Sequence, residues 1–232
     1  MKKTVLIFLI TLCSTLFLKA QDGCSKYYPM TEGSSFQYTN YNKKGKIEGV
    51  TKYNVTAVSS EGAALKATLN FKMSDKKGKE LFATDYHFTC ENNMVKIDYN
   101  SLFPAHMMQR YSEMDAEMDI SGSDLEIPND LHVGKELANA NVSMTMNMSG
   151  ISMNITVDQT NRIVETKETI TTPAGTFECF VISELTTSKT MGTTLKINSK
   201  IWLAEGVGMV KQETYKRNGE LMSKTMLTEF TK

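Results

Sequence analysis

Methionines at alternate positions are the first residues in this chain whose type and spacing could do chemistry. Met144, Met146 and Met148 recur at every second position, and Met153 follows after a short break. Thioether sulfurs suit Cu(I), and alternate side chains of a strand share one face. At roughly 6.6 Å apart along a strand, however, they are too widely spaced for one ion without help from a facing strand. The same four residues could instead line a surface for an apolar ligand or pack an ordinary core.

Acidic residues at alternate positions form a second candidate set. Asp115, Glu117 and Asp119 have the two-residue spacing of oxygen ligands in a calcium loop. The glycine of such a loop is misplaced here, and the same carboxylates fit the solvent face of a strand. We therefore expect no metal site in this segment.

Sequence signatures of enzymes are absent. The chain has no nucleophile elbow, no HExxH, no CxxC and no phosphate-binding glycine loop. Its three histidines, His87, His106 and His132, fall on three different predicted elements. We expect no catalytic residue and no cofactor, and therefore a protein that is not an enzyme.

Three cysteines, Cys24, Cys90 and Cys179, follow the apolar N-terminus of the chain. Cys90 and Cys179 each alternate with apolar side chains, so both are expected to face the core. An odd number of cysteines in an oxidising compartment allows one disulfide and one free thiol, with three possible pairings. The residue pattern leaves these pairings open, together with the possibility that all three thiols stay free.

The methionines belong to a segment that reads as a complete β-hairpin, residues 142–157. Apolar and polar residues alternate on both sides of Ser149-Gly150. With these two residues as the loop, Met146 faces Met153 and Met144 faces Ile155. Alternation in register across a glycine turn predicts an antiparallel sheet with one apolar face.

The rest of the chain repeats this strand pattern. Three turns, at residues 42–46, 75–79 and 216–220, each place a glycine after charged or polar residues and between two strand-like runs. Around the last turn, the expected register sets Glu213 against Lys224 and Tyr215 against Met222. The predicted strands are 34–42, 47–59, 63–74, 80–90, 94–99, 114–120, 141–148, 151–158, 161–171, 176–189, 194–204, 207–217 and 220–230.

One segment looks helical and one looks irregular. Pro104 suits a first helical position, and apolar residues recur near helical spacing over 104–114, which predicts one short bracing helix. Residues 121–139 are rich in turn formers and should link two halves. The fold class is therefore all-β, with long antiparallel strands forming a curved sheet, half-barrel or roll. A closed barrel and a sandwich also remain open.

The first twenty residues have the features of an export signal. Lys2 and Lys3 precede an apolar run over 5–18, and Ala20 supplies a small residue at the cleavage site. A lipoprotein signal fits poorly, because no small-residue box precedes Cys24. We expect cleavage after Ala20, which leaves residues 21–232 as a single all-β domain.

Charge and hydropathy restrict the partners. The chain has 26 basic and 26 acidic residues, and three of the lysines lie in the signal, so the mature chain carries a net charge of −3. No basic field is present to bind nucleic acid. No further apolar run is long enough to cross a bilayer as a helix. A soluble periplasmic or secreted protein is therefore expected, and not an integral membrane protein.

Three motifs resemble one exported family. They are the segments 27–33 (YYPMTEG), 171–179 (TTPAGTFEC) and 202–211 (WLAEGVGMVK). Together with the signal and the lysine-glycine turns, they resemble the TapB-like proteins, which are related to a wider group of bacterial β-proteins of unknown function. The resemblance covers nearly the whole mature chain. It implies an all-β exported domain and assigns a functional role to no residue.

These features favour a non-enzymatic exported protein that binds an apolar ligand, such as a lipid, in the concavity of its sheet. The candidate ligand-binding residues are Met144, Met146, Met148 and Met153. The alternative is a structural or accessory envelope protein that docks a protein partner through a sheet edge or a surface patch. In that case the methionines are core residues.

Overall fold

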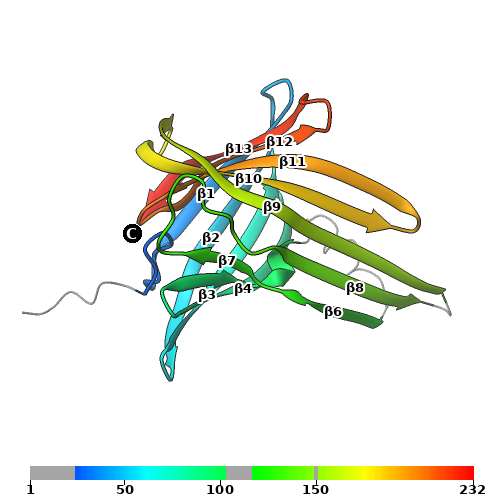
Figure 1. Cartoon of the computed structure of the whole chain (residues 1–232), viewed down its shortest axis with the longest axis horizontal. Coiled ribbons are helices and arrows are strands. Elements are labelled where there is room, and N and C mark those ends of the chain that lie inside the picture. The colour runs from blue at the N-terminus through cyan, green and yellow to red at the C-terminus, as the bar shows by residue number, and fades with distance from the viewer. Residues whose placement is uncertain (1–23, 103–116, 149–150) are drawn as a thin grey trace, which may run out of the picture.

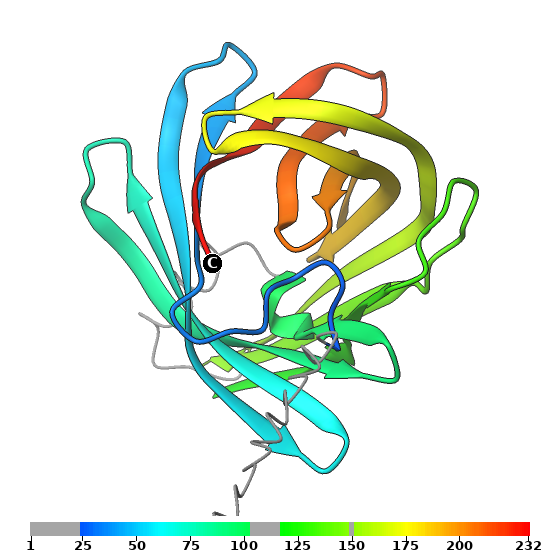
Figure 2. The same cartoon turned by 90° about the vertical axis from the view of Figure 1, so that its left-hand side faces the viewer.

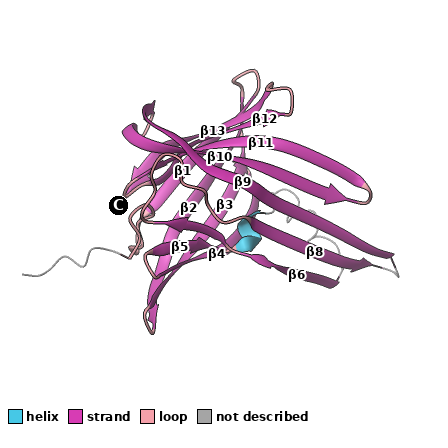
Figure 3. Cartoon of the chain, in the orientation of Figure 1, coloured by secondary structure: helices cyan, strands magenta, loops and turns pink. Residues whose placement is uncertain are grey.

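Antiparallel β-strands make up most of the protein (Figures 1 and 3). The computed structural model describes residues 24–102, 117–148 and 151–232, and within these residues its helical content is one 3-10 turn, η1 (Tyr99–Leu102). The strands are β1 (Ser35–Asn42), β2 (Ile47–Glu61), β3 (Ala64–Asp75), β4 (Glu80–Glu91), β5 (Met94–Ile97), β6 (Glu117–Ser123), β7 (Leu125–Pro128), β8 (Ala140–Met148), β9 (Ile151–Thr172), β10 (Gly175–Thr190), β11 (Thr193–Ala204), β12 (Gly208–Lys216) and β13 (Leu221–Thr231). The predicted all-β fold class is confirmed.

All of these strands belong to one 13-stranded sheet, in the order β6-β8-β9-β10-β11-β12-β13-β1-β2-β3-β4-β5-β7. The two edge strands, β6 and β7, are consecutive in the chain, with only Asp124 between them. The chain therefore passes directly from one edge of the sheet to the other. Figure 2 shows the result, a sheet that curls round on itself into a nearly closed barrel.

The segment between β7 and β8 also takes part in this closure. β8 ends its pairing with β9 at Ala140 opposite Gln159. Beyond that point the backbone of residues 134–137 covers the same side of β9, with Leu137 N donating to the carbonyl of Arg162 at 2.8 Å. The backbone groups of β9 are thus satisfied along the seam of the barrel.

The predicted hairpin of β8 and β9 is confirmed in its register. Met146 pairs with Met153, and Met144 pairs with Ile155. Such a register is strongly specified because a shift of one residue would turn every apolar side chain to the opposite face.

The charged turns are confirmed as hairpins, and the first two of them share one set of side-chain hydrogen bonds. In the β3–β4 turn, the Asp75 carboxylate accepts hydrogen bonds from the backbone N–H groups of Lys77 and Lys79, at 2.8 and 2.9 Å. Asn42 bonds in the same way in the β1–β2 turn. These side-chain acceptors hold the turn that the following glycine completes at positive φ.

Several sequence predictions need correction. Residues 151–158 and 161–171 form one continuous strand, β9. The strand predicted at 114–120 continues to Ser123 as β6, and its predicted first residues, 114–116, lie outside the described residues. The expected link at 121–139 contains the end of β6 and all of β7, which was missed because it is only four residues long. A bulge in the β12–β13 hairpin pairs Tyr215 with Leu221 in place of Met222, although Glu213 faces Lys224 as predicted. The helix predicted at 104–114 lies outside the described residues.

Candidate functional site

The inside of the barrel holds a cavity of about 600 Å³. Its lining comes from inward-facing positions of most strands, from η1 and from the N-terminal segment. A cavity of this size lies within the range that holds small-molecule ligands. The two walls of the cavity differ in chemistry.

One wall, formed by β1 to β5 and β7, is aromatic and aliphatic. Tyr38, Tyr53 and Tyr86 line it, together with Phe36 and Phe88. The rings of Tyr38 and Tyr53 meet edge to face, with centroids 5.9 Å apart. Phenol rings in this arrangement offer a large, rigid apolar surface.

The tyrosines of this wall stay neutral near physiological pH. Burial raises the pKa of Tyr86 to about 12, and it raises the pKa values of Tyr38 and Tyr53 still further above 10.0. The Tyr38 hydroxyl donates a hydrogen bond to the carbonyl of Met209 at 2.9 Å. The aromatic wall therefore presents ring surface and no charge.

The opposite wall, formed by β9 to β12, carries polar side chains. Gln159, Thr186, Ser199, Gln212 and Thr214 line it between aliphatic residues. These groups alternate with outward-facing neighbours along each strand, as the pleat requires. The cavity thus has an aromatic side and a side that can form hydrogen bonds.

A buried ion pair lies in the polar wall. Arg162 of β9 and Glu184 of β10 both line the cavity, and each side chain is only 1% exposed. The Nε atom of Arg162 lies 3.5 Å from Oε2 of Glu184. The Nη1 atom of Arg162 donates to the carbonyl of Ala138 at 2.5 Å, and both Nη atoms reach the carbonyl of Glu126 at 3.3 Å. The guanidinium group therefore joins β9 to β7 across the seam of the barrel.

A β-bulge directs Arg162 into the barrel. Ser183 pairs with Ile163 and Leu185 pairs with Thr160, so Asn161 and Arg162 together face the single residue Glu184. Asn161 takes up the extra residue with a φ of 53°, a conformation that asparagine tolerates better than most residues. The bulge thus restores Arg162 to the inward face that Gln159 occupies.

Burial dominates the titration of this pair. It raises the pKa of Glu184 above its ordinary 4.5, although Arg162 acts in the opposite direction. It also lowers the pKa of Arg162, again against the influence of Glu184. Both shifts have the same cause, the removal of two charges from water.

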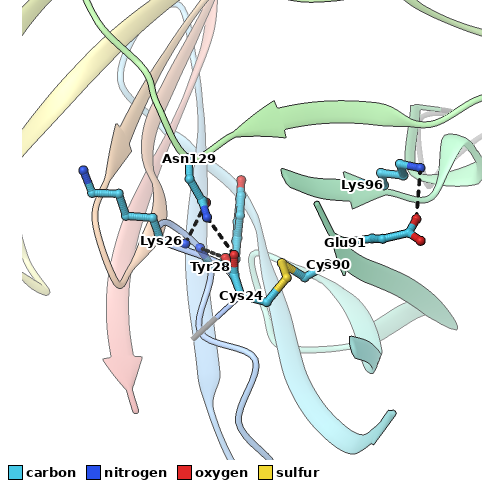
Figure 4. The surroundings of a disulfide bond; sticks show 8 residues. Cys24, Lys26, Tyr28, Cys90, Glu91, Lys96 and Asn129 are labelled. Atoms are coloured by element: carbon cyan, nitrogen blue, oxygen red, sulfur yellow. Dashed lines mark hydrogen bonds and ion pairs between the residues drawn. A yellow bond between two sulfur atoms is a disulfide. The ribbon is translucent and has the colours of Figure 1, made fainter. Parts of the chain in front are cut away.

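The N-terminal segment, residues 24–34, crosses one end of the barrel (Figure 2). A disulfide joins Cys24 to Cys90 of β4, and the side chain of Asn129 bonds both the carbonyl of Cys24 and the N–H of Lys26, at 2.7 and 2.9 Å (Figure 4). Tyr28 lines the cavity from this segment, with its ring centroid 5.1 Å from that of Phe88. The segment therefore contributes directly to the wall of the site.

The disulfide resolves the three pairings that the sequence left open. Cys24 and Cys90 are bonded, and Cys179 is a buried free thiol. The expectation that Cys90 and Cys179 face the core is confirmed, since both are 0% exposed. Burial raises the pKa of the Cys179 thiol to about 11, which keeps it protonated and unreactive.

Two of the four methionines, Met144 and Met153, belong to a separate apolar cluster. Met144 is fully buried with Val142, Ile155 and Val157, and Met153 packs against them. Met146 is 3% exposed and faces Met153 in the register, while the side chain of Met148 lies outside the described residues. Val157 also lines the cavity, but the described methionines of the hairpin do not. Their predicted contact with a ligand therefore stays a prediction.

The other residues considered from the sequence are dispersed. His87 lies on β4 beside Thr68, and His132 lies in the loop after β7. Asp119 is exposed on β6, while His106 and Asp115 lie outside the described residues. The described part of the chain contains no cluster of three histidine, cysteine, aspartate or glutamate side chains placed to hold a metal ion.

Sequence reasoning missed the residues that line the polar wall. Only Glu184 could have been recognised from the sequence, because it lies on the same face of β10 as Ile182 and Thr186. A carboxylate in phase with an apolar face indicates a buried charge that needs a partner. Arg162 gave no such signal, because the bulge at Asn161 breaks the alternation between Gln159 and Arg162.

The family assignment follows from comparison with known proteins. The DUF3108-like family matches residues 31–227, most of the chain. The chain belongs to this family. The match supports the broader part of the sequence resemblance, a family of unknown function, and does not test the narrower TapB-like name. A search of curated proteins finds no match.

Two crystal structures share the fold of this DUF3108-like protein. A Bacteroides fragilis protein, named as exported and as having a YmcC-like fold, is 22% identical with a TM-score of 0.74, and the alignment covers 90% of this chain and 100% of that one. A Parabacteroides distasonis protein, named as a lipoprotein, is 23% identical with a TM-score of 0.73, and the alignment covers 89% and 99% of the two chains. In this protein, no helix among the described residues is long and apolar enough to cross a membrane.

Proposed function

We propose that this protein is exported and binds an apolar ligand, such as a lipid, inside its barrel without catalysing a reaction. The observation that carries the proposal is the cavity of about 600 Å³, one wall of which consists of neutral aromatic and aliphatic side chains. Burial of apolar ligand surface against such a wall is favourable in proportion to the area removed from water.

Three observations support export. The first twenty residues have the composition of a cleaved signal, Cys24 and Cys90 form a disulfide, and the two relatives of known structure are named as an exported protein and a lipoprotein. Disulfides form and persist in oxidising compartments. The sulfur of Cys24 is bonded to Cys90 and is therefore not available for lipid attachment. We expect a mature N-terminus at Gln21 with no added lipid, which intact-mass measurement of the purified protein tests.

Ligand binding is tested with the protein from its own envelope and with a neutral apolar probe. Native mass spectrometry of freshly purified protein should detect a bound small molecule of lipid mass. After this small molecule is removed by solvent extraction, the protein should bind N-phenyl-1-naphthylamine, and the fluorescence of the probe should increase. Protein that carries no small molecule and fails to bind the probe would contradict the proposal.

A pair of variants locates the probe. Ile197 of β11 lines the cavity, and its neighbour Lys196 is exposed on the outer face. Ile197→Trp enlarges a side chain within the cavity and should weaken probe binding. Lys196→Trp adds the same ring outside the barrel and should leave binding unchanged. An equal effect of both variants would place the probe outside the cavity.

The alternative, a structural protein that docks an envelope partner, has weaker support. The exposed large hydrophobic side chains among the described residues are spread over the start of β2, the loop after β7 and the β10–β11 hairpin, at Ile47, Val133, Met191 and Leu195. Scattered residues of this kind are normal on soluble surfaces. Leu195, moreover, lines the cavity, which fits a rim for an incoming ligand equally well.

A further inference from the structure

We propose that the ligand is a neutral amphiphile with hydroxyl groups at its polar end, and that this end binds Gln159, Arg162 and Glu184. The inference rests on the proposed function, because it assigns a chemical class to the ligand of the same cavity. It is carried by three observations: the two-sided lining, the unused hydrogen-bonding atoms and the balance of charge.

The two-sided lining favours an amphiphile over a plain hydrocarbon. Tyr38, Tyr53 and Tyr86 face the cavity from one side, while Gln159, Thr186 and Gln212 face it from the other. A hydrocarbon would cover both sides and remove the polar wall from water without giving it hydrogen-bonding partners. An amphiphile can place its apolar body on the rings and its polar end on β9 and β10.

Three atoms of the polar wall have unused hydrogen-bonding capacity. Oε1 of Gln159 is buried and accepts no hydrogen bond from the described residues. Nε of Arg162 and Oε2 of Glu184 are also buried without a hydrogen bond, because their separation of 3.5 Å is long for one. The polar wall thus offers both an unused donor, Arg162 Nε, and unused acceptors, the oxygens of Gln159 and Glu184.

A hydroxyl group fits this combination. It donates one hydrogen bond and accepts others, so a single hydroxyl can donate to the Glu184 carboxylate and accept from the Arg162 guanidinium. A second hydroxyl on the neighbouring carbon can bond the Gln159 amide. Glycerol and sugar groups carry hydroxyls in this arrangement.

The balance of charge favours a neutral polar end. Among the described residues that line the cavity, Arg162 and Glu184 are the charged ones, and together they carry no net charge. A carboxylate on the ligand would meet Glu184 as well as Arg162, and an ammonium group would meet Arg162 as well as Glu184. A pair without net charge does not compensate a ligand charge that is moved out of water, which is unfavourable.

The test uses three ligands with the same twelve-carbon chain. 1-Monolauroylglycerol has a neutral end with two hydroxyls, methyl laurate has a neutral end with none, and laurate has a charged end. Each competes with N-phenyl-1-naphthylamine for the wild-type protein. We expect monolauroylglycerol to compete with a Kd about tenfold lower than those of the other two, because unpaired polar groups in a site select for the ligand that pairs them.

Two variants on one strand assign the effect. Gln159→Leu removes the unpaired amide from the cavity, and it should raise the Kd of monolauroylglycerol about tenfold while leaving methyl laurate unchanged. Thr156→Val is the matched control, because Thr156 Oγ1 is also buried without a partner but does not line the cavity. This control should leave the binding of all three ligands unchanged.

The outcomes separate this inference from the proposed function. Equal competition by the three ligands, or a preference for laurate or methyl laurate, overturns the hydroxyl-bearing class while the cavity remains a binding site. Failure of the probe and of all three ligands to bind overturns both. The ligand comparison uses wild-type protein, so it does not depend on how well the variants fold.

Discussion

Arg162 and Glu184 are the residues on which the interior of this protein most depends. Both side chains are buried, and each is the charged partner of the other. Burial raises the pKa of Glu184 and lowers the pKa of Arg162. Arg162 also donates to the carbonyls of Glu126 and Ala138. One side chain therefore both neutralises a buried carboxylate and joins the seam of the barrel. The pair is expected to be costly to break.

Replacing Arg162 by methionine should destabilise the protein by about 3–5 kcal/mol, because it leaves a buried carboxylate without its partner. Adding Glu184→Leu should recover part of this loss by removing the charge, whereas the carbonyls of Glu126 and Ala138 stay without their donor. Urea unfolding of the single and double variants measures the difference. Equal stability of Arg162→Met and the double variant would show that the unpaired Glu184 carboxylate is not the cause of the loss.

The loss of stability caused by Arg162→Met should also depend on pH. Burial already raises the pKa of Glu184 above 4.5, and removal of Arg162 takes away the influence that lowers it. A carboxyl with a raised pKa binds its proton more tightly in the folded state, so the folded state gains stability as the pH falls. The deficit of the variant should therefore shrink between about pH 7 and pH 5. A deficit that grows over this range would contradict the assignment.

Met146 tests the alternative chemistry of the hairpin. Its side chain is 3% exposed opposite Met153. Met146→Leu keeps volume and apolarity and should cost less than about 1.5 kcal/mol, whereas Met146→Asp should unfold the domain by burying an unpaired charge. Stoichiometric, chelator-resistant Cu(I) binding that the leucine variant loses would replace the packing interpretation with a copper site.

At the scale of elements, close approaches of the backbone decide how the N-terminal segment docks. Gly208, at the start of β12, has a φ of +88°, and a Cβ atom there would lie 2.4 Å from the ring of Tyr28. Tyr28 in turn lines the cavity and contacts Phe88. Because Gly208 has no side chain, the Tyr28 ring can pack against its backbone and occupy this position in the cavity wall.

Gly208→Ala should therefore do more than strain the backbone. Gly219 is the matched control, because its φ of +83° is similar and no atom lies within 4 Å of a Cβ placed there. Gly219→Ala should cost roughly 1–2 kcal/mol from its left-handed conformation alone. Gly208→Ala should cost more and should also weaken binding of N-phenyl-1-naphthylamine. Equal losses of stability and unchanged binding would show that Tyr28 moves aside freely.

At the scale of the whole molecule, the connection between the edge strands, a covering segment and a long-range disulfide hold the nearly closed barrel together. The edge strands β6 and β7 follow one another directly, residues 134–137 cover β9, and the disulfide joins Cys24 to Cys90 across 66 residues. Crosslinks over such long loops reduce the entropy of the unfolded chain most.

Removal of this disulfide by Cys24→Ser and Cys90→Ser should lower stability by roughly 4 kcal/mol if loop entropy dominates. Cys179→Ser is the control, because Cys179 is buried and unbonded and should contribute less. Peptide mapping of the native protein should recover Cys24 linked to Cys90, and Cys179 should react with iodoacetamide only after unfolding. Alkylation of Cys24 in the native protein would contradict the pairing.

Local pattern was sufficient to predict most of the strands and turns of this protein. The alternation of Met144, Met146 and Met153 around Ser149-Gly150 determined the register of β8 and β9, because a slip of one residue would turn the apolar side chains of one strand to the opposite face. The charged turns likewise determined where β1, β3 and β12 end. The four-residue strand β7 escaped detection because so short a run carries too little periodicity.

The candidate site, by contrast, was decided by tertiary structure. Met144 and Met153, two of the methionines predicted to bind a ligand, belong to a separate apolar cluster. The cavity is lined by residues from strands that meet only when the sheet curls. A bulge that the alternation of residues does not reveal turns Arg162 towards Glu184. Cys24 and Cys90 are bonded although 66 residues separate them in the sequence. The sequence by itself determined most of the strands, the charged turns and the register of β8 and β9, because these depend on neighbouring residues. The cavity, its ion pair and its disulfide depend on how distant segments pack, which local pattern does not encode.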